Sequence, residues 1–411
     1  MRHDAAAAIF AAGAAAALGG PFPDCAFAPL PSLPATGPVR ALAAAPAHRG
    51  GDDLIIAARL LATDFFALGE GAPQPLTSIP SGVVFPPTCH SVSIDGPRAL
   101  TLRGTGAVAT TRVALLDIAN GASPAPIAHA DITSEFILRR IALQGLHAFV
   151  LIQNAQSGIR ALQTLDLAEP GFPFSLKSLN ARDFALDGQT IYLLTSHNTV
   201  EARNAAEPFV LPLLGQPVSI ANLGSAGLAM TVAGDRLYIR NESGRLATID
   251  VSDPSSLVTL SAGSADAFPP SGAFFADVGD LAAHEDVVYM PGVADDETVW
   301  LVALDMSLPP HPVEIARFPL PEAGAYPIET TSRGVVVGAD GLLHFAFVRC
   351  PCIGDTDGDG FIGFADVNTV LSAFNSHKGL PGYDPAADIN QDGDVNFADL
   401  NLVVSVFNTE C

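Results

Sequence analysis

Turn-forming residues recur along the middle of the chain at a nearly constant spacing, and this repeat is the strongest constraint on the fold. Between residues 51 and 350, short β-type runs alternate with turns rich in Gly, Asp, Asn and Pro, and there is little helix-period signal. Successive turn anchors lie 43 to 51 residues apart, at Gly51, Gly96, Gly145, Gly188, Gly234, Glu285 and Gly334. A period in the forties with several strands per unit is typical of a β-propeller. The sequence therefore predicts a mainly β chain with seven blades over residues 51–350. Six blades, or an irregular pair of β-sandwiches, are the alternatives.

A second signal lies late in most units, where an apolar strand ends in Leu-Asp or Ile-Asp before a turn. The aspartates are Asp117, Asp166, Asp250 and Asp305, and the unit from Gly188 to Gly215 has Glu201-Ala-Arg-Asn204 instead. An Asp side chain can accept hydrogen bonds from its own turn backbone. We therefore interpret these four residues as turn residues rather than as catalytic carboxylates that converge on a channel.

One unit is the clearest copy of the repeat. It runs from Val232 to Pro254 and reads VAGDRLYIR, then LATIDVSDP. It resembles the repeats of extracellular propellers built of LVIVD-type units, and the resemblance extends over most of residues 51–350 in divergent copies. The last unit, 334–350, holds only about two strands. It therefore needs an N-terminal strand to complete the ring and hide the sheet edges.

The C-terminal segment is acidic, with nine Asp and one Glu against one Lys in residues 355–411. Two twelve-residue loops, 355–366 and 388–399, carry oxygen side chains at positions 1, 3, 5 and 12 and Gly at position 6. This is the EF-hand pattern, because Ca²⁺ takes six to eight oxygen ligands and alternate residues of a tight loop can point at one centre. The sequence predicts two Ca²⁺ ions. The predicted ligands are Asp355, Asp357, Asp359, the Phe361 carbonyl and Asp366 in the first loop, and Asp388, Asn390, Asp392, the Asp394 carbonyl, Asn396 and Asp399 in the second.

Each loop leads into an amphipathic helix, and nothing helical precedes either loop. The expected apolar faces are Val367, Val370, Leu371 and Phe374 in the first helix, and Leu400, Val403, Val404 and Phe407 in the second. Ile362 and Val395, at loop position 8, are expected to pair the two loops through a short β-bridge.

This pair of loop-then-helix units resembles a type I dockerin, the calcium-dependent module that binds cohesin domains in extracellular polysaccharide-degrading assemblies. The resemblance covers residues 354–411. It implies partner contacts at loop positions 10 and 11, which are Phe364, Ala365, Phe397 and Ala398 here and are often Ser-Thr in that family. Two near-identical halves also imply two related binding orientations. The resemblance thus implies a cohesin-like or another extracellular protein as the partner. The alternative is a calcium-stabilised cap that has no partner.

The N-terminus indicates export. A weakly basic start is followed by the apolar run from Ala5 to Leu18, and Ala26-Phe27-Ala28 has the form of a cleavage site, so residues 1–28 are predicted to be a signal peptide. A disordered Ala-rich tail is the alternative. Residues 29–50 read as a Pro/Ala-rich linker in which 39–43 is a candidate strand. No other apolar run approaches the ~18 residues of a membrane helix. The protein is expected to be secreted or displayed at the cell surface.

The cysteines support the same compartment. Removal of Cys25 leaves an even four, as an oxidising compartment favours: Cys89, Cys350, Cys352 and Cys411. Cys352–Cys411 with Cys89–Cys350 is the predicted pairing, and Cys350–Cys411 is the competing one. The domains are thus a signal peptide (1–28), a linker (29–50), a propeller (51–350) and a dockerin-like module (351–411).

Composition limits the functions. A formal net charge of −23 argues against broad capture of nucleic acid, which needs clustered Lys and Arg. No nucleophile-elbow, zinc-protease or Walker motif is present. The favoured function is a secreted calcium-binding protein whose dockerin-like tail anchors a binding or structural propeller, with a glycan or protein ligand, to an extracellular partner. The alternative is a polysaccharide-active hydrolase or lyase with the propeller as its catalytic domain, which would require paired carboxylates in the channel.

Overall fold

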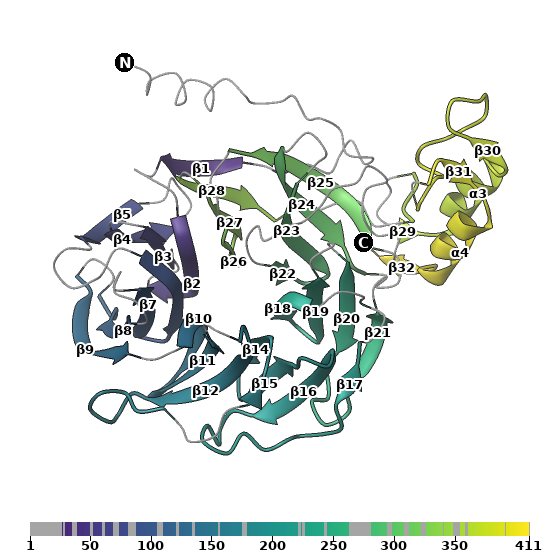
Figure 1. Cartoon of the computed structure of the whole chain (residues 1–411). Helices are drawn as coiled ribbons and strands as arrows, with labels where there is room; N and C mark the ends of the chain where they lie inside the picture. The colour runs from purple at the N-terminus through teal and green to yellow at the C-terminus, as the bar shows by residue number, and fades with distance from the viewer. Residues whose placement is uncertain are drawn as a thin grey trace.

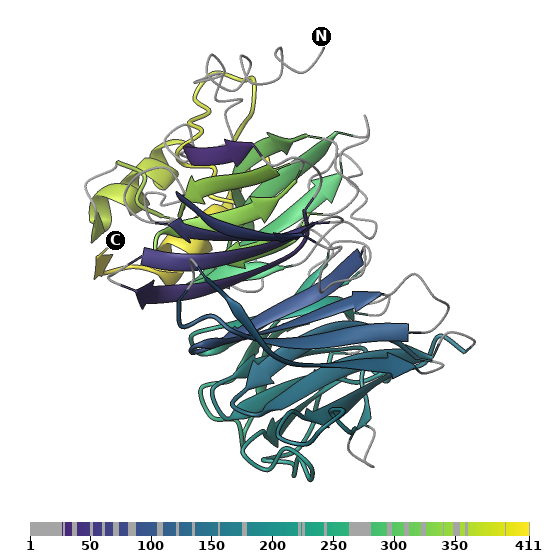
Figure 2. The same ribbon diagram turned by 90° about the vertical axis from the view of Figure 1, so that its left-hand side faces the viewer.

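The alternating runs and turns fold into seven four-stranded antiparallel sheets that surround a central channel (Figure 1). The computed structural model describes residues 27–410 apart from 28, 35–38, 50–51, 60–61, 69–73, 81–87, 105–109, 121–122, 134–135, 155–156, 175–178, 221–222, 224–226, 242–244, 263–280, 294–297, 308–311, 322–325, 340, 348–353, 358–360 and 391. The seven-blade prediction is confirmed, and the six-blade and β-sandwich alternatives are wrong. Figure 2 shows the ring from its side.

Each blade is a meander in which the first strand lies next to the channel. Blade 1 consists of β2 (Val39–Arg49), β3 (Asp52–Arg59), β4 (Ala62–Leu68) and β5 (Gln74–Pro80). Blade 2 consists of β6 (Thr88–Asp95), β7 (Arg98–Gly104), β8 (Thr110–Asp117) and β9 (Ala125–Thr133). Blade 3 consists of β10 (Phe136–Gln144), β11 (His147–Asn154), β12 (Arg160–Asp166) and β13 (Leu179–Asn180). Blade 4 consists of β14 (Asp183–Asp187), β15 (Thr190–Leu194), β16 (Thr199–Asn204) and β17 (Val218–Ser219). Blade 5 consists of β18 (Gly227–Ala233), β19 (Arg236–Asn241), β20 (Leu246–Asp250) and β21 (Val258–Ala262). Blade 6 consists of β22 (Ala282–His284), β23 (Val287–Val293), β24 (Val299–Asp305) and β25 (Val313–Leu320).

Blade 7 closes the ring with strands from both ends of the chain. It consists of β26 (Ile328–Thr330), β27 (Gly334–Gly338), β28 (Gly341–Ala346) and, as its outermost strand, β1 (Pro29–Pro34). Pro29 lies opposite Phe345, and Leu30 lies opposite His344. The prediction that an N-terminal strand completes the last blade is confirmed, although the blade has three C-terminal strands rather than about two.

The predicted linker over residues 29–50 is wrong, because most of it forms β1 and β2. Prolines made this stretch look like a linker, but β1 is an edge strand, where a missing backbone N–H is tolerated. Strand β2 belongs to blade 1, and the Val39 N–H donates to the Ala339 carbonyl of blade 7 (2.9 Å). The propeller therefore begins at β1 rather than at residue 51.

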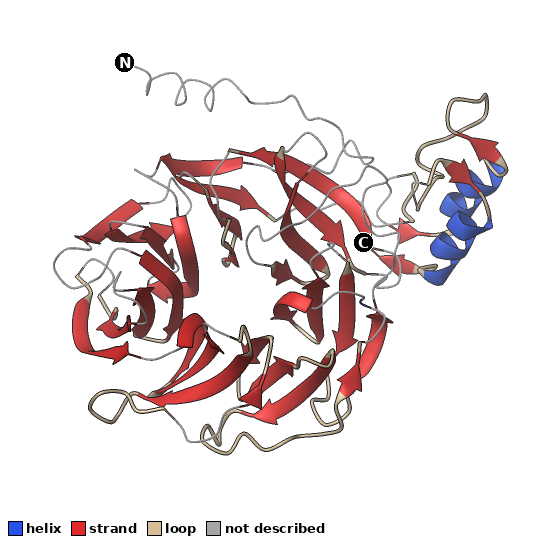
Figure 3. Cartoon of the chain, viewed as in Figure 1, coloured by secondary structure: helices blue, strands red, loops and turns tan. Residues whose placement is uncertain are grey.

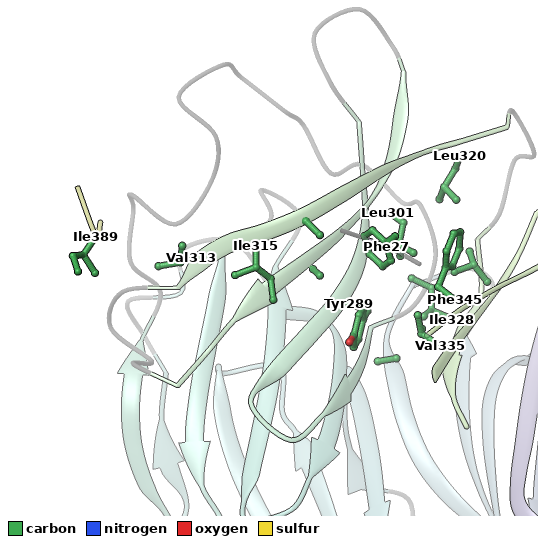
Figure 4. Close-up of a cluster of buried hydrophobic side chains, with 14 of the residues drawn as sticks. Phe27, Tyr289, Leu301, Val313, Ile315, Leu320, Ile328, Val335, Phe345 and Ile389 are labelled. Atoms are coloured by element: carbon green, nitrogen blue, oxygen red, sulfur yellow. The ribbon is translucent and has the colours of Figure 1, made fainter. Parts of the chain in front are cut away.

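Neighbouring blades are held together by apolar side chains from both sheet faces. The cluster in Figure 4 joins blades 6 and 7 through residues such as Tyr289, Ile315, Val335 and Phe345. Phe27 belongs to this cluster, with its ring centroid 5.2 Å from that of Phe345. Cleavage after Ala28, at the predicted site, would remove this buried ring from the core. Residues 1–26 lie outside the described part of the chain, so the signal peptide itself stays a prediction.

The four strand-end aspartates are turn residues, as predicted. Their Oδ1 atoms accept the backbone N–H two residues further on, at 2.7–3.0 Å, in Asp117, Asp166, Asp250 and Asp305. In the divergent blade 4, Asn204 makes the same bond to the Ala206 N–H (3.0 Å). The amide oxygen thus replaces the carboxylate, because the turn requires only a short side-chain acceptor.

The C-terminal unit contains two helices, which Figure 3 shows in blue. They are α3 (Phe364–Ser372) and α4 (Phe397–Ser405), and they are accompanied by the short strands β29 (Phe361–Ile362), β30 (Ser376–His377), β31 (Asp394–Val395) and β32 (Thr409–Glu410). Its core joins the cluster of blades 6 and 7, where Ile389 lies at the end beyond Val313 (Figure 4). Val370 and Val403 are fully buried as expected, but Leu371 and Val404 are about half exposed because each helix packs one narrow face.

Candidate metal centre and central channel

The first loop gathers three of its predicted calcium ligands around one point. Carboxylate oxygens of Asp355, Asp357 and Asp366 all lie within 4.8 Å of one another. Asp359 lies outside the described residues. Phe361 stands at the predicted carbonyl position at the start of β29. The clustered carboxylates offer the hard oxygen donors that Ca²⁺ prefers.

Backbone N–H groups orient the last carboxylate of this loop. Asp366 is fully buried; its Oδ1 accepts the Thr356 N–H (2.6 Å), and its Oδ2 accepts the Gly363 N–H (2.7 Å). Burial alone raises the pKa of Asp366, but the hydrogen bonds from Gly363 and Thr356 outweigh it and hold the pKa below its ordinary value. Asp366 is therefore held in its charged form, as a metal ligand requires.

The second loop repeats the fold of the first, but its carboxylates are less closely grouped. The Asn390 and Asn396 N–H groups donate to the two oxygens of buried Asp399, at 3.1 and 2.9 Å. Asp392 accepts from the Asn390 side chain (3.0 Å) and from the Asp394 N–H (2.8 Å). Within the described residues of this loop, no three carboxylates approach one another as closely as those of the first. Asn396 also caps helix α4, because its Oδ1 accepts the Ala398 N–H (2.7 Å).

Asp388 provides an independent test of the metal hypothesis. Its side chain is 3% exposed, and its Oδ1 is buried without a hydrogen-bond partner among the described residues. Its Oδ2 accepts the Tyr383 hydroxyl (2.6 Å) and the Gly393 N–H (3.0 Å). Burial raises the pKa of the Asp388 carboxyl despite these bonds, and the charges of Asp399 and Asp392 add to the rise. A buried acceptor without a donor is costly, so the residues fit a cation at this point.

The expected β-bridge between the two loops is wrong. Ile362 pairs with Thr409 behind the second helix, and Val395 pairs with Ser376 behind the first. The segment that follows each helix therefore returns to pair with the opposite loop. Strands β29 and β31 lie 33 residues apart in the sequence, and so do β30 and β32. The unit consequently has an internal two-fold arrangement.

The predicted partner-contact positions follow the same two-fold arrangement. Phe364 is 77% exposed and Phe397 is 68% exposed, at the first residue of each helix. Each ring packs at about 4.9 Å, edge to face, against an aromatic residue behind the other helix: Phe364 on Phe407, and Phe397 on Phe374. Ala365 and Ala398 follow in the first turns of the helices, and both are exposed. Large exposed aromatic side chains at related positions are typical of a contact surface.

The propeller's channel is polar and contains arginines. A cavity of about 430 Å³ is lined mainly by the inner strands of blades 1 to 4, with Leu151 and Arg160 from the next strands of blade 3 and Glu329 from blade 7. The described carboxylates in its lining are Asp183 and Glu329. Asp183 is buried and accepts from Arg140 Nη1 (2.8 Å) and from the Met230 N–H of blade 5 (2.9 Å). Asp183 thus connects three blades, which is a structural role.

Comparisons with known proteins show the fold. Solved structures that resemble the chain include the RRP9 WD40 repeats (TM-score 0.52, 10% identity, 79% of this chain and 100% of that one). A chain of the mitotic checkpoint complex has a TM-score of 0.51, with 12% identity over 82% of this chain and 98% of that one. U3-55K has a TM-score of 0.50, with 10% identity over 78% of this chain and 98% of that one.

The chain is a seven-bladed β-propeller. No protein-family model and no curated protein matches it. The LVIVD-type and dockerin-like resemblances therefore stay predictions from the residues that carry them. Among the described residues, no helix is long and apolar enough to cross a membrane.

Two groups of site residues were missed from the sequence. Tyr383, whose hydroxyl donates to Asp388, lies outside the twelve-residue loop pattern. The channel arginines Arg40 and Arg139 carry no motif, although they lie about two blade periods apart at the start of inner strands. The disulfide predictions are untested, because four of the cysteines lie outside the described residues and the side chain of Cys89 is not described.

Proposed function

We propose that residues 354–411 bind two Ca²⁺ ions and dock the propeller, as a secreted binding domain, onto an extracellular protein of the cohesin type. The buried Oδ1 of Asp388, which lacks a hydrogen-bond donor, is the observation that most supports the metal. The clustered carboxylates of the first loop support a second ion. Ca²⁺ affinities of about 10⁻⁴–10⁻³ M suffice for extracellular modules, so Asp at position 12 in both loops is compatible with this role.

The docking part of the proposal rests on Phe364 and Phe397. Both rings remain exposed although the unit packs against the propeller, so the propeller does not cover this surface. The two-fold arrangement presents nearly the same aromatic surface in two orientations. A partner with a pocket for one ring could bind either half.

The calcium part is tested by calorimetric titration of the full chain after chelator treatment. We expect two Ca²⁺ per chain in the wild type. Asp357→Asn and Asp392→Asn should each remove one ion, because each replaces an exposed, charged ligand by a neutral amide that keeps one acceptor oxygen for local hydrogen bonds such as that from the Asp394 N–H. Asp384→Asn, outside both loops, is the matched control and should leave two. Absence of binding heat in the wild type would overturn the proposal.

The docking part is tested by binding to immobilised type I cohesin domains in calcium and in chelator. We expect calcium-dependent binding that survives Phe364→Ala or Phe397→Ala alone and is lost in the double variant. Calcium binding without cohesin binding would overturn docking in favour of the calcium-stabilised cap.

The enzyme alternative gains no support from the channel. An enzyme of this kind would require paired carboxylates in the channel. Asp183 instead forms an ion pair with Arg140. We therefore retain the binding function for the propeller.

A further inference from the structure

The central channel is bordered by the inner strands of all seven blades. The larger cavity, of about 430 Å³, is lined from β2, β6, β10, β14 and β26, with Leu151 of β11 and Arg160 of β12. A smaller cavity, of about 210 Å³, is lined from β10, β14, β18, β22 and β26, and the two share Arg140 and Glu329. A volume of about 430 Å³ is in the range of small-molecule sites.

Three consecutive inner strands carry a β-bulge at corresponding positions near their first residues. In β2, Val39 pairs with Arg59 and Ala41 with Ala58, so Arg40 is the additional residue. The register of β10 leaves Arg139 in the same position, and that of β6 leaves His90. A bulge redirects a side chain and locally ends regular pairing, and bulges are over-represented beside functional sites.

The bulges bring Arg40 and Arg139 to the wall of the same cavity. Both side chains are exposed, so the cavity opens to solvent where they lie. Arg139 Nε donates to the Gln153 side chain of the neighbouring strand (2.8 Å), which orients its guanidinium. β18 has a bulge at Leu228 as well, whereas β14, β22 and β26 pair with their neighbours without a register shift. Among the bulged inner strands, those of blades 1 and 3 have arginine at this position.

The charge of this cavity is opposite to that of the whole chain. The chain has 20 Lys and Arg against 43 Asp and Glu. The lining of the larger cavity contains four arginines, Arg40, Arg139, Arg140 and Arg160, against the two acids Asp183 and Glu329. Since Asp183 is matched by Arg140, positive charge is left in excess. A low-dielectric cleft of one sign concentrates ligands of the opposite sign.

Serine hydroxyls stiffen the same wall. Ser91 Oγ accepts the Ile141 N–H (3.2 Å), and Ser93 Oγ accepts the Leu143 N–H (3.0 Å). These bonds join β6 to β10 within a few residues of the bulges at His90 and Arg139. Arg139 therefore stands on a strand that is bonded to its neighbouring blade, and Arg40 likewise stands on an inner strand rather than on a loop.

We infer that the channel cavity, at the wall formed by blades 1 to 3, binds a small organic anion, recognised through a carboxylate, sulfate or phosphate group by Arg40 and Arg139. The planar guanidinium fork matches these oxyanions in bidentate geometry. The cavity holds a ligand of about the size of a sugar acid. This site is separate from residues 354–411, although it gives a ligand class to the proposed binding propeller.

The test is calorimetric titration of the full chain in calcium buffer at low ionic strength. The probes are galacturonate, inorganic sulfate and inorganic phosphate, with galactose as the neutral counterpart of galacturonate. We expect at least one anion to bind at least tenfold more tightly than galactose, and the affinity to fall with added salt. Binding of galacturonate alone identifies an organic carboxylate, and binding of sulfate or phosphate alone identifies a tetrahedral oxyanion.

Variants locate the site. Arg40→Gln with Arg139→Gln should lower the affinity for that anion at least tenfold, with an unchanged circular dichroism spectrum. Arg98→Gln is the matched control, because Arg98 begins β7, donates to the Gly145 carbonyl (3.3 Å) and is not among the residues that line the cavity. Asp357→Asn should bind the anion normally, which separates this inference from the calcium proposal. Failure of every anion to bind, or full binding by the double variant, would overturn it.

Discussion

Protonation of one buried histidine should make the propeller acid-sensitive. His344 lies in β28 of the closing blade and is only 3% exposed. Burial lowers its pKa to about 4; nearby Asp53 opposes this decrease, and Arg333 adds to it. The folded state therefore holds the imidazole neutral, whereas the unfolded chain protonates it near its ordinary pKa of 6.5.

The sign and magnitude follow from linkage. Between pH 6.5 and pH 4 the unfolded state binds a proton that the folded state does not, so stability falls as the pH falls. Each tenfold difference in proton affinity corresponds to about 1.4 kcal/mol, so a pKa of about 4 against 6.5 amounts to about 3 kcal/mol. Above pH 6.5, protonation of His344 leaves the unfolding free energy unchanged. By pH 4.5 it should have lowered the unfolding free energy by about 2.5 kcal/mol.

The assay is urea unfolding at pH 7.0 and pH 4.5, followed by the fluorescence of Trp300, the chain's single tryptophan. His344→Leu cannot take up the proton, so its drop in unfolding free energy should be smaller than that of the wild type by about 2.5 kcal/mol. The exposed-site control His197→Leu should keep the full drop. Equal drops in His344→Leu and the wild type would refute the reasoning.

Three further substitutions test how the blades are joined, each by urea unfolding at pH 7. Asp183→Ala should cost about 3 kcal/mol, because it leaves Arg140 without its partner in the channel wall; a cost below that of the isosteric Asp183→Asn would contradict the connecting role. Gly338→Ala should cost roughly 1–3 kcal/mol, since a Cβ there would lie 2.7 Å from Val39 Cγ1, where blade 7 meets blade 1; unchanged stability would show that the junction is loose. Phe27→Ala should cost about 3 kcal/mol if the mature chain retains this ring, and N-terminal sequencing of secreted protein should find a start upstream of it.

Local features were predicted well because short windows of sequence encode them. The strand-end aspartates form turns with residues two positions away, and the EF-type loops bond within twelve residues. The error over residues 29–50 has the same origin. Composition alone could not reveal that the proline-rich segment is an edge strand, since its partner β28 is some 300 residues away.

The sequence alone therefore determined the blade period, the turn residues at the strand ends and the oxygen-rich loops, since each depends on side-chain alternation or hydrogen bonds between near neighbours. Only the tertiary structure decided which strand closes the ring, how each helix end returns to the opposite loop, and that Arg40 and Arg139 share one cavity. These features arise from pairing between distant segments and from bulges that redirect single side chains. Neither leaves a periodic trace in the chain.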